Sequence, residues 1–441
     1  MKNRFLHGFL LTVAFVVSFS SFSSFVTYAD QVKVDYVALG DSLAAGVTPE
    51  STPENPPKNG YADYLARHIN ELGSLQSYEK RYAVPGYTSQ NVINDLIADV
   101  KKPSEALDPR GLRTAVSNAE IVTVSAGAND MLRTLKIDGD TGETTIDLEK
   151  FEQSLQTVGK NLTAIYAEVK GLNPEVDVYF MGYYNPYPYL PSDQKAKLDT
   201  ALQQLNNVIQ QAAAATGVSY VPTSEQFQKQ AKNLLPDPTN IHPNKEGHLV
   251  IANQFWKAFE LQEPTEFNDV DNDSYAFNEI NELTAKGILK GYGDGSFGPN
   301  DSIKRSHASI MLTRSIIFHN EDMPADPDFS DIWSNMASYS SIARLTEEGV
   351  IDGFPGGMFK PNESLTREQM AKILVTALKL ESKHTDLSFP DVDEDSWAYP
   401  YIKILAEHEI TLGHEDGEFK PKQEVTREQL AAFLARSMRN E

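Results

Sequence analysis

Residues 30–261 alternate between short hydrophobic runs and longer segments in which apolar residues recur at helical spacing. Runs rich in Val, Ile, Tyr and Phe predict strands at 34–39, 77–84, 121–126, 176–182 and 218–222. The spacing of apolar residues predicts helices at 61–72, 88–101, 148–170 and 192–215. Strands and helices that alternate in this way indicate an α/β domain with a parallel sheet.

Near Glu263 this pattern gives way to an Asp- and Asn-rich sequence with an internal repeat. Asp269, Asp331 and Asp391 recur at steps of 62 and 60 residues, and four other residue types keep the same steps. These are Gly291, Gly353 and Gly413, then Phe297, Phe359 and Phe419, then Pro299, Pro361 and Pro421, and finally Arg305, Arg367 and Arg427. Such columns indicate three copies of one two-helix unit, which we place at 262–325, 326–385 and 386–441.

The N-terminal end has the pattern of an export signal. Lys2 and Arg4 precede an apolar stretch from about Phe9 to Val17, and small residues at Thr27-Tyr28-Ala29 resemble a cleavage site. We therefore expect a signal peptide at 1–29 and a mature chain beginning at Asp30. An uncleaved membrane anchor is the alternative, but the apolar stretch is shorter than the roughly 18–20 residues that a spanning helix needs.

Composition narrows the classes of function. The 441 residues carry a formal net charge of −23, which argues against a general nucleic-acid or anionic-membrane binder. The chain has no cysteine, so neither disulfides nor thiolate metal sites are available. The histidines form no ligand spacing, and Asp269–Asp273 lacks the glycine and distal glutamate of an EF-hand loop. We expect no metal and no cofactor.

Four short motifs fall after the predicted strands or before a helix. They are Gly40-Asp41-Ser42-Leu43, Gly86 after Pro85, Gly127-Ala128-Asn129-Asp130, and His242-Pro243-Asn244. Each alone is a common turn or helix-capping sequence. Together they supply a serine nucleophile, a histidine base and oxyanion donors, the set that ester hydrolysis needs. The first three lie at carboxyl ends of predicted strands, where ligands bind in parallel α/β sheets.

In this order the four motifs resemble those of the SGNH, or GDSL, hydrolases over residues 34–260. The resemblance implies a flavodoxin-like three-layer fold with Ser42 as nucleophile and His242 as base. It also implies an oxyanion hole made by the N–H groups of Ser42 and Gly86 and the side-chain amide of Asn129. The expected reaction is hydrolysis of a carboxylic ester through an acyl-enzyme.

One position departs from the family pattern. An aspartate usually stands three residues before the histidine, but Thr239 occupies that place. Asp237 is the only nearby acid on the N-terminal side, and it is the candidate third catalytic residue. It could instead be a turn residue between Pro236 and Pro238. The Asn240 side chain or a backbone carbonyl could then orient the imidazole.

The repeats resemble surface-layer homology modules. The resemblance implies a three-lobed helical domain that binds anionic secondary cell-wall polysaccharide. The resemblance makes Arg305, Arg367 and Arg427 the expected glycan contacts. From the residues alone, these arginines could bind an anion beside a helix N-terminus or pair with an acid at the surface. Repeat one departs most, with Lys304 and Ser306-His307 replacing the usual residues, so its groove could be weak or silent.

Together these features predict a secreted esterase held non-covalently on the wall of a Gram-positive bacterium. A wall polysaccharide O-acetylesterase is one alternative, and a catalytically inert wall-binding protein is another. The aromatic run from Tyr183 to Tyr189 could line an acyl or sugar site, or it could be a surface turn with buried rings. Substrate, active groove and oligomeric state stay open at this stage.

Overall fold

The computed structural model describes residues 32–102, 111–138, 143–261, 264–318, 324–385, 387–414 and 416–440. The expected signal peptide and the start of the mature chain lie outside these ranges. The first domain is built on a five-stranded sheet in the order β2-β1-β3-β6-β7, and every strand pair in it is parallel. This is the strand order of flavodoxin-like folds, so the predicted fold class is confirmed.

The strands of this sheet are β1 (Val34–Gly40), β2 (Leu75–Glu79), β3 (Ile121–Ser125), β6 (Asp177–Met181) and β7 (Ser219–Val221). Every residue of β3 is buried, as is most of β1. Near-continuous apolar runs are what a parallel sheet with both faces covered requires.

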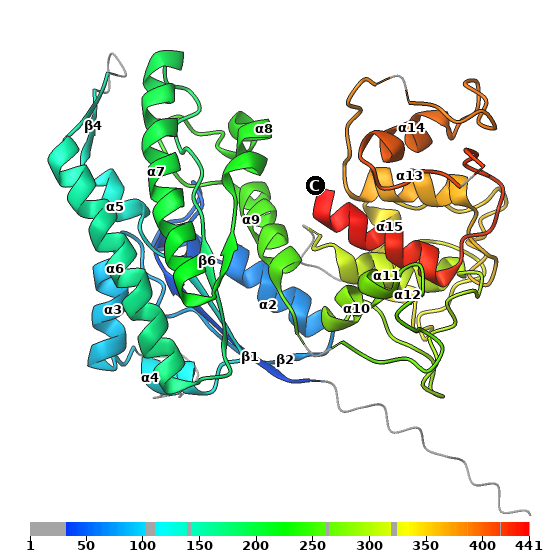
Figure 1. The fold of residues 1–441 in the computed structure, drawn as a ribbon, viewed down its shortest axis with the longest axis horizontal. Helices are drawn as coiled ribbons and strands as arrows, with labels where there is room; N and C mark the ends of the chain where they lie inside the picture. Colours follow the sequence, from blue (N-terminus) through cyan, green and yellow to red (C-terminus); the bar gives the residue numbers. More distant parts are fainter. Residues whose placement is uncertain are drawn as a thin grey trace, which may run out of the picture.

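Helices cover both faces of the sheet and complete three layers (Figure 1). One group contains α3 (Ser89–Ala98), α6 (Leu148–Leu172) and α7 (Ser192–Thr216), with the short α4 (Leu112–Ser117) packed on α6. The other contains α2 (Tyr61–Glu71), α8 (Ser224–Leu234) and α9 (Lys245–Ala258). Two shorter helices, α1 (Ser42–Ala45) and α5 (Ala128–Leu132), follow β1 and β3 directly.

Several elements differ from the sequence prediction, and the helices α4 and α8 were not among those predicted. The strand predicted at 77–84 is β2, which ends at Glu79, and the following loop keeps only one bridge to the sheet, between Ala83 and Gly40. Lys80 turns away from the strand because its ammonium pairs with the carboxylate of Asp63 at 2.7 Å. A small antiparallel hairpin, β4 (Leu135–Ile137) and β5 (Thr144–Ile146), was not predicted and lies outside the main sheet.

The second domain contains two helices per repeat, as predicted. They are α10 (Phe277–Ala285) and α11 (Arg305–Ser315), α12 (Tyr339–Glu347) and α13 (Arg367–Ala377), and α14 (Tyr399–Glu407) and α15 (Arg427–Asn440). Neighbouring repeats pair through α11 with α12 and α13 with α14, and α15 returns to pack on α10. The three repeats therefore form a closed ring.

The centre of the ring is a triangle of backbone hydrogen bonds between equivalent residues. Ile303 N–H donates to Val425 O at 2.8 Å, Val425 N–H to Leu365 O at 2.9 Å, and Leu365 N–H to Ile303 O at 3.0 Å. All three side chains are fully buried. Because each repeat supplies one donor and one acceptor, the three copies satisfy one another's backbone groups.

The recurring aspartates have a structural role in each repeat. Asp269 accepts hydrogen bonds from the N–H groups of Phe297 and Gly298 at 2.6 and 2.8 Å. Asp331 and Asp391 make the same pair of bonds to the turns at Phe359 and Phe419. The carboxylate thus fixes the turn that buries the repeated phenylalanine. This role explains why the aspartate and the phenylalanine recur, and it needs no metal.

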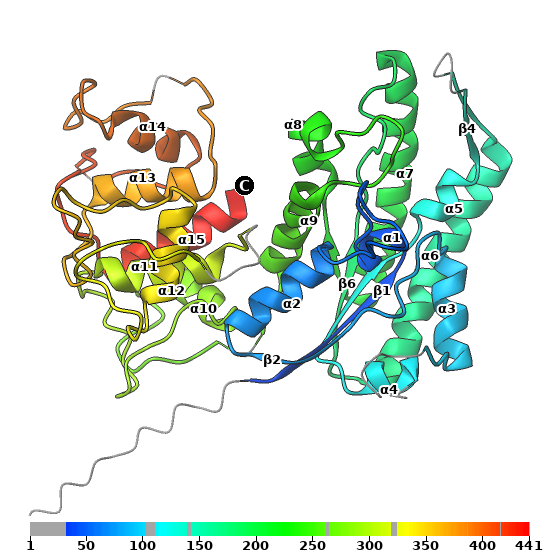
Figure 2. The same ribbon diagram turned by 180° about the vertical axis from the view of Figure 1, so that it is seen from behind.

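Repeat one packs against the α2 and α9 face of the first domain (Figures 1 and 2). His68 of α2 donates from Nε2 to Arg314 O at 3.1 Å. The Lys286 ammonium donates to Lys257 O and Phe259 O, at 2.7 and 2.8 Å, at the end of α9. The junction near 261 is tied by Leu261 N–H to Ala285 O at 2.8 Å, while residues 262–263 lie outside the described ranges.

Candidate active site

Ser42 lies in the sharp turn between β1 and α1. Gly40 has φ +133°, and a Cβ there would lie 2.0 Å from Ser125 O, so only glycine fits this close approach of β1 to β3. Asp41 caps α1 by accepting a hydrogen bond from Leu43 N–H at 2.9 Å. Ser42 is therefore the first residue of a helix, and its own N–H donates to no group among the described residues.

Asp41 is more than a helix cap. Besides Leu43 N–H, its carboxylate accepts hydrogen bonds from Ser125 Oγ at 3.0 Å and Tyr183 Oη at 2.7 Å. These bonds join the ends of β1, β3 and β6 under the nucleophile. Burial raises the pKa of Asp41 to about 6, although the three hydrogen bonds act in the opposite direction. Sequence reasoning missed Ser125, which belongs to no motif, and it named Tyr183 without predicting its bond to Asp41.

His242 is oriented by Asn240. The imidazole Nδ1–H donates to Asn240 Oδ1 at 2.8 Å, and the same oxygen accepts from His242 N–H at 3.0 Å. This bond leaves Nε2 as the proton acceptor of the neutral ring. Burial lowers the pKa of His242 below its ordinary value, which keeps the ring neutral to lower pH.

The structure corrects the assignment of Asp237 as the third catalytic residue. Its carboxylate is exposed and accepts hydrogen bonds from Thr239 N–H at 2.8 Å and Thr239 Oγ1 at 2.7 Å. Asp237 thus closes a local turn, the second interpretation that the sequence left open. That turn brings Asn240 to the ring, so a neutral amide occupies the place of the usual carboxylate.

His248 is a second buried histidine that sequence reasoning did not single out. It lies one turn into α9, after the Asn244 side chain caps that helix. Its Nε2–H donates to Val47 O at 2.9 Å, and its Nδ1 accepts from Tyr61 N–H at 3.2 Å. Burial lowers the pKa of His248 to about 4, so the ring stays neutral and keeps both bonds. His248 thereby ties α9 to the chain just after α1. In the sequence, the only sign of this histidine was its position after Gly247, shortly after His242.

Asn129 is held by its neighbours on α5. The Asp130 carboxylate accepts from Ser89 N–H at 2.8 Å and Ser89 Oγ at 2.9 Å, which fixes α5 against α3. The Asn129 amide donates one hydrogen to Tyr87 O at 2.9 Å. Its second amide hydrogen is free for a ligand. Asn129 and the loop that carries Gly86 are therefore linked through Tyr87.

Gly86 lies in an exposed stretch of that loop, at φ +83°. Its N–H donates to no group among the described residues. It does not line the cavity that contains Ser42, Asn129 and His242. The structure thus brings three of the four motifs to one cavity and leaves the fourth beside it.

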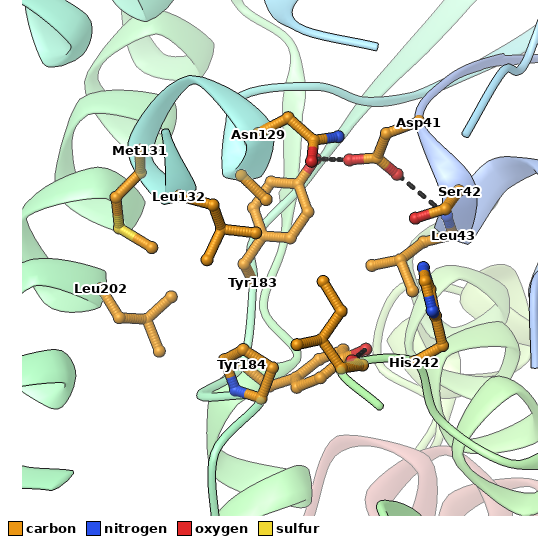
Figure 3. A pocket seen from close by; sticks show the side chains of 13 residues that line it. Asp41, Ser42, Leu43, Asn129, Met131, Leu132, Tyr183, Tyr184, Leu202 and His242 are labelled. Carbon is orange, nitrogen blue, oxygen red and sulfur yellow. Dashed lines mark hydrogen bonds between the residues drawn. The ribbon is translucent and has the colours of Figure 1, made fainter. Parts of the chain in front are cut away.

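The cavity separates catalytic groups from apolar ones (Figure 3). Ser42 and His242 face each other on one side, with Asn129 at the edge near Asp41. No hydrogen bond joins Ser42 Oγ to the ring in the described structure, as is common in free enzymes before substrate tightens the contact. Tyr183 and Tyr184 are both buried, and both line the cavity. The first two rings of this aromatic run are thus buried at the cavity, whereas Tyr189 at its end is exposed.

The recurring arginines are largely buried and join one repeat to the next. The Nε–H groups of Arg305, Arg367 and Arg427 donate to the carbonyls of Phe359, Phe419 and Phe297, at 3.0, 2.6 and 2.7 Å. Each guanidinium also lies about 4.5 Å above the ring of that phenylalanine. These contacts between repeats explain why the arginines recur. Among the described residues, the arginines are held by carbonyl and aromatic groups and not by an ion pair with a surface acid.

The environment of Arg367 differs from that of the other two arginines. Tyr292 lies 4.8 Å from the Arg427 guanidinium, and Phe354 lies 4.8 Å from that of Arg305. His414 occupies the equivalent position beside Arg367, and a cavity of about 470 Å³ opens there. Its wall includes Tyr275 and Arg436 together with Glu409 and Glu428. The buried Nε2 of His414 has no hydrogen-bond partner.

Across the described residues, no cluster of three His, Asp or Glu side chains is arranged to hold a metal ion. Nor does any helix in those ranges combine the length and apolar character needed to cross a bilayer.

The first domain is a three-layer α/β fold around a parallel sheet, with a serine in its first strand-to-helix turn and a histidine beside that serine. These features are typical of a serine hydrolase domain. Residues 38–250 match the GDSL-like Lipase/Acylhydrolase family, so this domain belongs to that family and is of the carboxylic ester hydrolase type. Residues 266–309, 327–371 and 388–431 match the S-layer homology domain.

Known proteins match parts of the chain. The Surface-layer 125 kDa protein of Lysinibacillus sphaericus is 29% identical over 179 residues, which are 40% of this chain and 15% of that protein. The S-layer protein sap of Bacillus anthracis is 34% identical over 175 residues, 39% of this chain and 21% of its own. A lipase from a goat rumen metagenome is a structural match, with 19% identity, a TM-score of 0.38 and coverage of 51% of this chain and 96% of that one. The chain thus spans about a fifth or less of these two surface proteins.

Proposed function

We propose that the first domain hydrolyses carboxylic esters, with Ser42 as nucleophile and His242 as general base. The observation that supports this most is the shared cavity of Ser42, His242 and Asn129, with the imidazole oriented by Asn240 so that Nε2 is free. Ser42 Oγ attacks the ester carbonyl as Nε2 takes its proton. The alcohol leaves with that proton, and water then releases the acid from the acyl-enzyme.

Three donors would stabilise the oxyanion in this proposal. Ser42 N–H and the free amide hydrogen of Asn129 lie at the cavity, and Gly86 N–H lies beside it without an internal partner. For the Gly86 N–H to reach the oxyanion, the loop that carries Gly86 would have to move toward the cavity. Because Asn240 is neutral, it orients the ring without adding charge stabilisation to the imidazolium.

Active-site labelling tests this proposal directly. A fluorophosphonate should modify Ser42 in the folded full-length protein, as mapped by mass spectrometry of peptides. Ser42→Ala should abolish both labelling and release of p-nitrophenol from short esters, and His242→Ala should slow both at least a thousandfold. Folded protein that neither reacts nor turns over would favour the alternative, an inert wall-binding protein. Labelling at another serine would refute the role of Ser42.

We also propose that the S-layer homology domains hold the protein at the bacterial cell surface by binding an anionic wall polysaccharide beside Arg367. The supporting observation is that Arg367 borders an open cavity on the side of His414, where aromatic rings lie beside the other two arginines. Burial lowers the pKa of Arg367 only to about 10, so its charge is retained at neutral pH. Repeat one was expected to be weak, and the Phe354 ring lies 4.8 Å from its arginine, Arg305, at the position that His414 holds beside Arg367.

The groove proposal is tested by exchanging the residue that differs between the repeats. His414→Phe introduces the ring found at Phe354 and should cover Arg367, so binding to purified cell walls should fall at least tenfold while helical content is unchanged. Phe354→Tyr, a change at a groove that is already covered, is the matched control and should bind normally. Unaltered binding by His414→Phe would refute this groove as the main site.

A further inference from the structure

We infer that the catalytic cavity accepts short acyl chains, and that Leu202 sets the upper limit of chain length. This inference rests on the proposed ester hydrolysis and adds a substrate class to it. It comes from the side of the cavity opposite the catalytic groups, which carries no part of the proposed chemistry.

That side is apolar and comes from separate elements. Met131 and Leu132 belong to α5 and Leu202 to α7, while Tyr184, Pro186 and Ile241 lie on the connecting loops. Figure 3 shows Met131, Leu132 and Leu202 across the cavity from Ser42 and His242. An acyl group attached to Ser42 Oγ, with its oxygen toward Asn129, would therefore extend its chain toward Leu202.

The size of the cavity limits the chain. The volume open to the centres of water-sized groups is about 40 Å³. So small a space favours a short chain in the range of acetyl to butyryl, and a chain of eight or more carbons would have to displace the wall.

The wall behind the cavity is not free to move aside. Leu202 is 4% exposed, and its neighbours along α7, Leu198 and Leu205, are 4% and 0% exposed. A side chain in such a close-packed region yields only at a cost in packing. The limit is therefore set by a fixed residue of the core, and it should move when that residue changes volume.

The polar side chains of the cavity are already engaged, so they are not available to bind a polar acyl group. Ser42, Asn129 and His242 are assigned to the reaction, and Asp41 is already bonded to Leu43, Ser125 and Tyr183. On the apolar wall the polar side-chain group is the Tyr184 hydroxyl, which donates to Ile241 O at 3.5 Å, so the wall offers little to a hydroxylated acid. The acid part of the ester is thus a short fatty acid, and a polar alcohol part would lie outside the cavity.

The test is the dependence of kcat/KM on chain length, measured with p-nitrophenyl acetate, butyrate, hexanoate and octanoate. For the full-length protein, kcat/KM should rise about fourfold per buried methylene up to butyrate and fall at least tenfold by octanoate. Leu202→Ala should raise the octanoate-to-butyrate ratio at least tenfold, and Leu202→Phe should favour acetate. Leu198→Ala makes the same truncation on the same helix outside the cavity, and it should lower stability without changing the ratio.

Met131→Ala provides a second route if Leu202→Ala does not fold, because it enlarges the same wall from α5 and should shift the preference the same way. A wild-type preference for octanoate, or an unchanged ratio in every folded wall variant, would overturn the inference while leaving ester hydrolysis intact. Absence of any hydrolysis together with absence of Ser42 labelling would instead refute the proposed function, and the inference with it.

Discussion

Asp41, beside the proposed nucleophile Ser42, lowers the stability of the folded protein when its carboxyl group is ionised. Its carboxyl group is fully buried, and its pKa is about 6 against an ordinary 3.8. The folded state therefore binds this proton more tightly than the unfolded state does. The ionised form is destabilising above the folded pKa, and this cost disappears as the pH falls below the ordinary value.

We predict that Asp41→Asn stabilises the protein at neutral pH and weakens catalysis. The difference of about 2 pKa units corresponds to about 3 kcal/mol, so the free energy of unfolding of the variant should gain on the wild type between pH 4 and pH 7.5. Denaturant unfolding at the two pH values measures this gain. Asp193→Asn, a change of an exposed side chain, should show no such trend. An equal difference at both pH values would contradict the assignment.

The sequence motifs named Ser42, Asn129 and His242 as candidates because each lies in a turn whose residues are consecutive, and the structure places all three at one cavity. They could not locate Ser125 or Tyr183, which reach Asp41 only when β3 and β6 lie beside β1. Asp237 was the wrong partner for the imidazole because separation along the chain does not reveal the direction of a turn. The hydrogen bonds to Thr239 determine that direction.

At the scale of elements, α9 determines where the base lies relative to the nucleophile. His242 comes three residues before α9 begins, and His248 within α9 bonds to Val47, which follows α1. Strand and helix periodicity identified most of these elements. The end of β2 was placed too late because Tyr82, Ala83 and Val84 follow the charged residues at 79–81, whereas the chain leaves the strand at Lys80, which pairs with Asp63.

We predict that His248→Ala lowers kcat more than tenfold and destabilises the protein by about 2–4 kcal/mol, because two buried hydrogen bonds are lost. His248→Gln, which can replace one of them, should recover part of kcat. His68→Ala removes the other fully buried histidine, at the contact with repeat one. It should destabilise comparably and keep kcat near the wild-type value. Equal loss of kcat in both alanine variants would show that His248 acts only through stability.

At the scale of the whole molecule, the ring of S-layer homology repeats and the hydrolase domain share a packed junction. The repeats were recognisable from their period, but which helices meet was not, because closure of α15 on α10 and contact of repeat one with α9 depend on tertiary packing. Lys286 carries most of the polar contact at the end of α9. It is 3% exposed and donates to two carbonyls that the helix itself cannot satisfy.

We predict that Lys286→Met uncouples the two domains. Methionine keeps the apolar contact of the stem but leaves both carbonyls without a charged donor, which should cost about 2–4 kcal/mol. Calorimetry should show the main transition shifted down by roughly 5–10 °C, with the hydrolase domain unfolding before the repeats. Lys290→Met changes an exposed lysine nearby and should leave the transition in place. Since α9 follows the loop that carries His242, ester hydrolysis by Lys286→Met should be lost at a lower temperature than wall binding. Simultaneous loss of both activities would mean that the junction depends on other contacts.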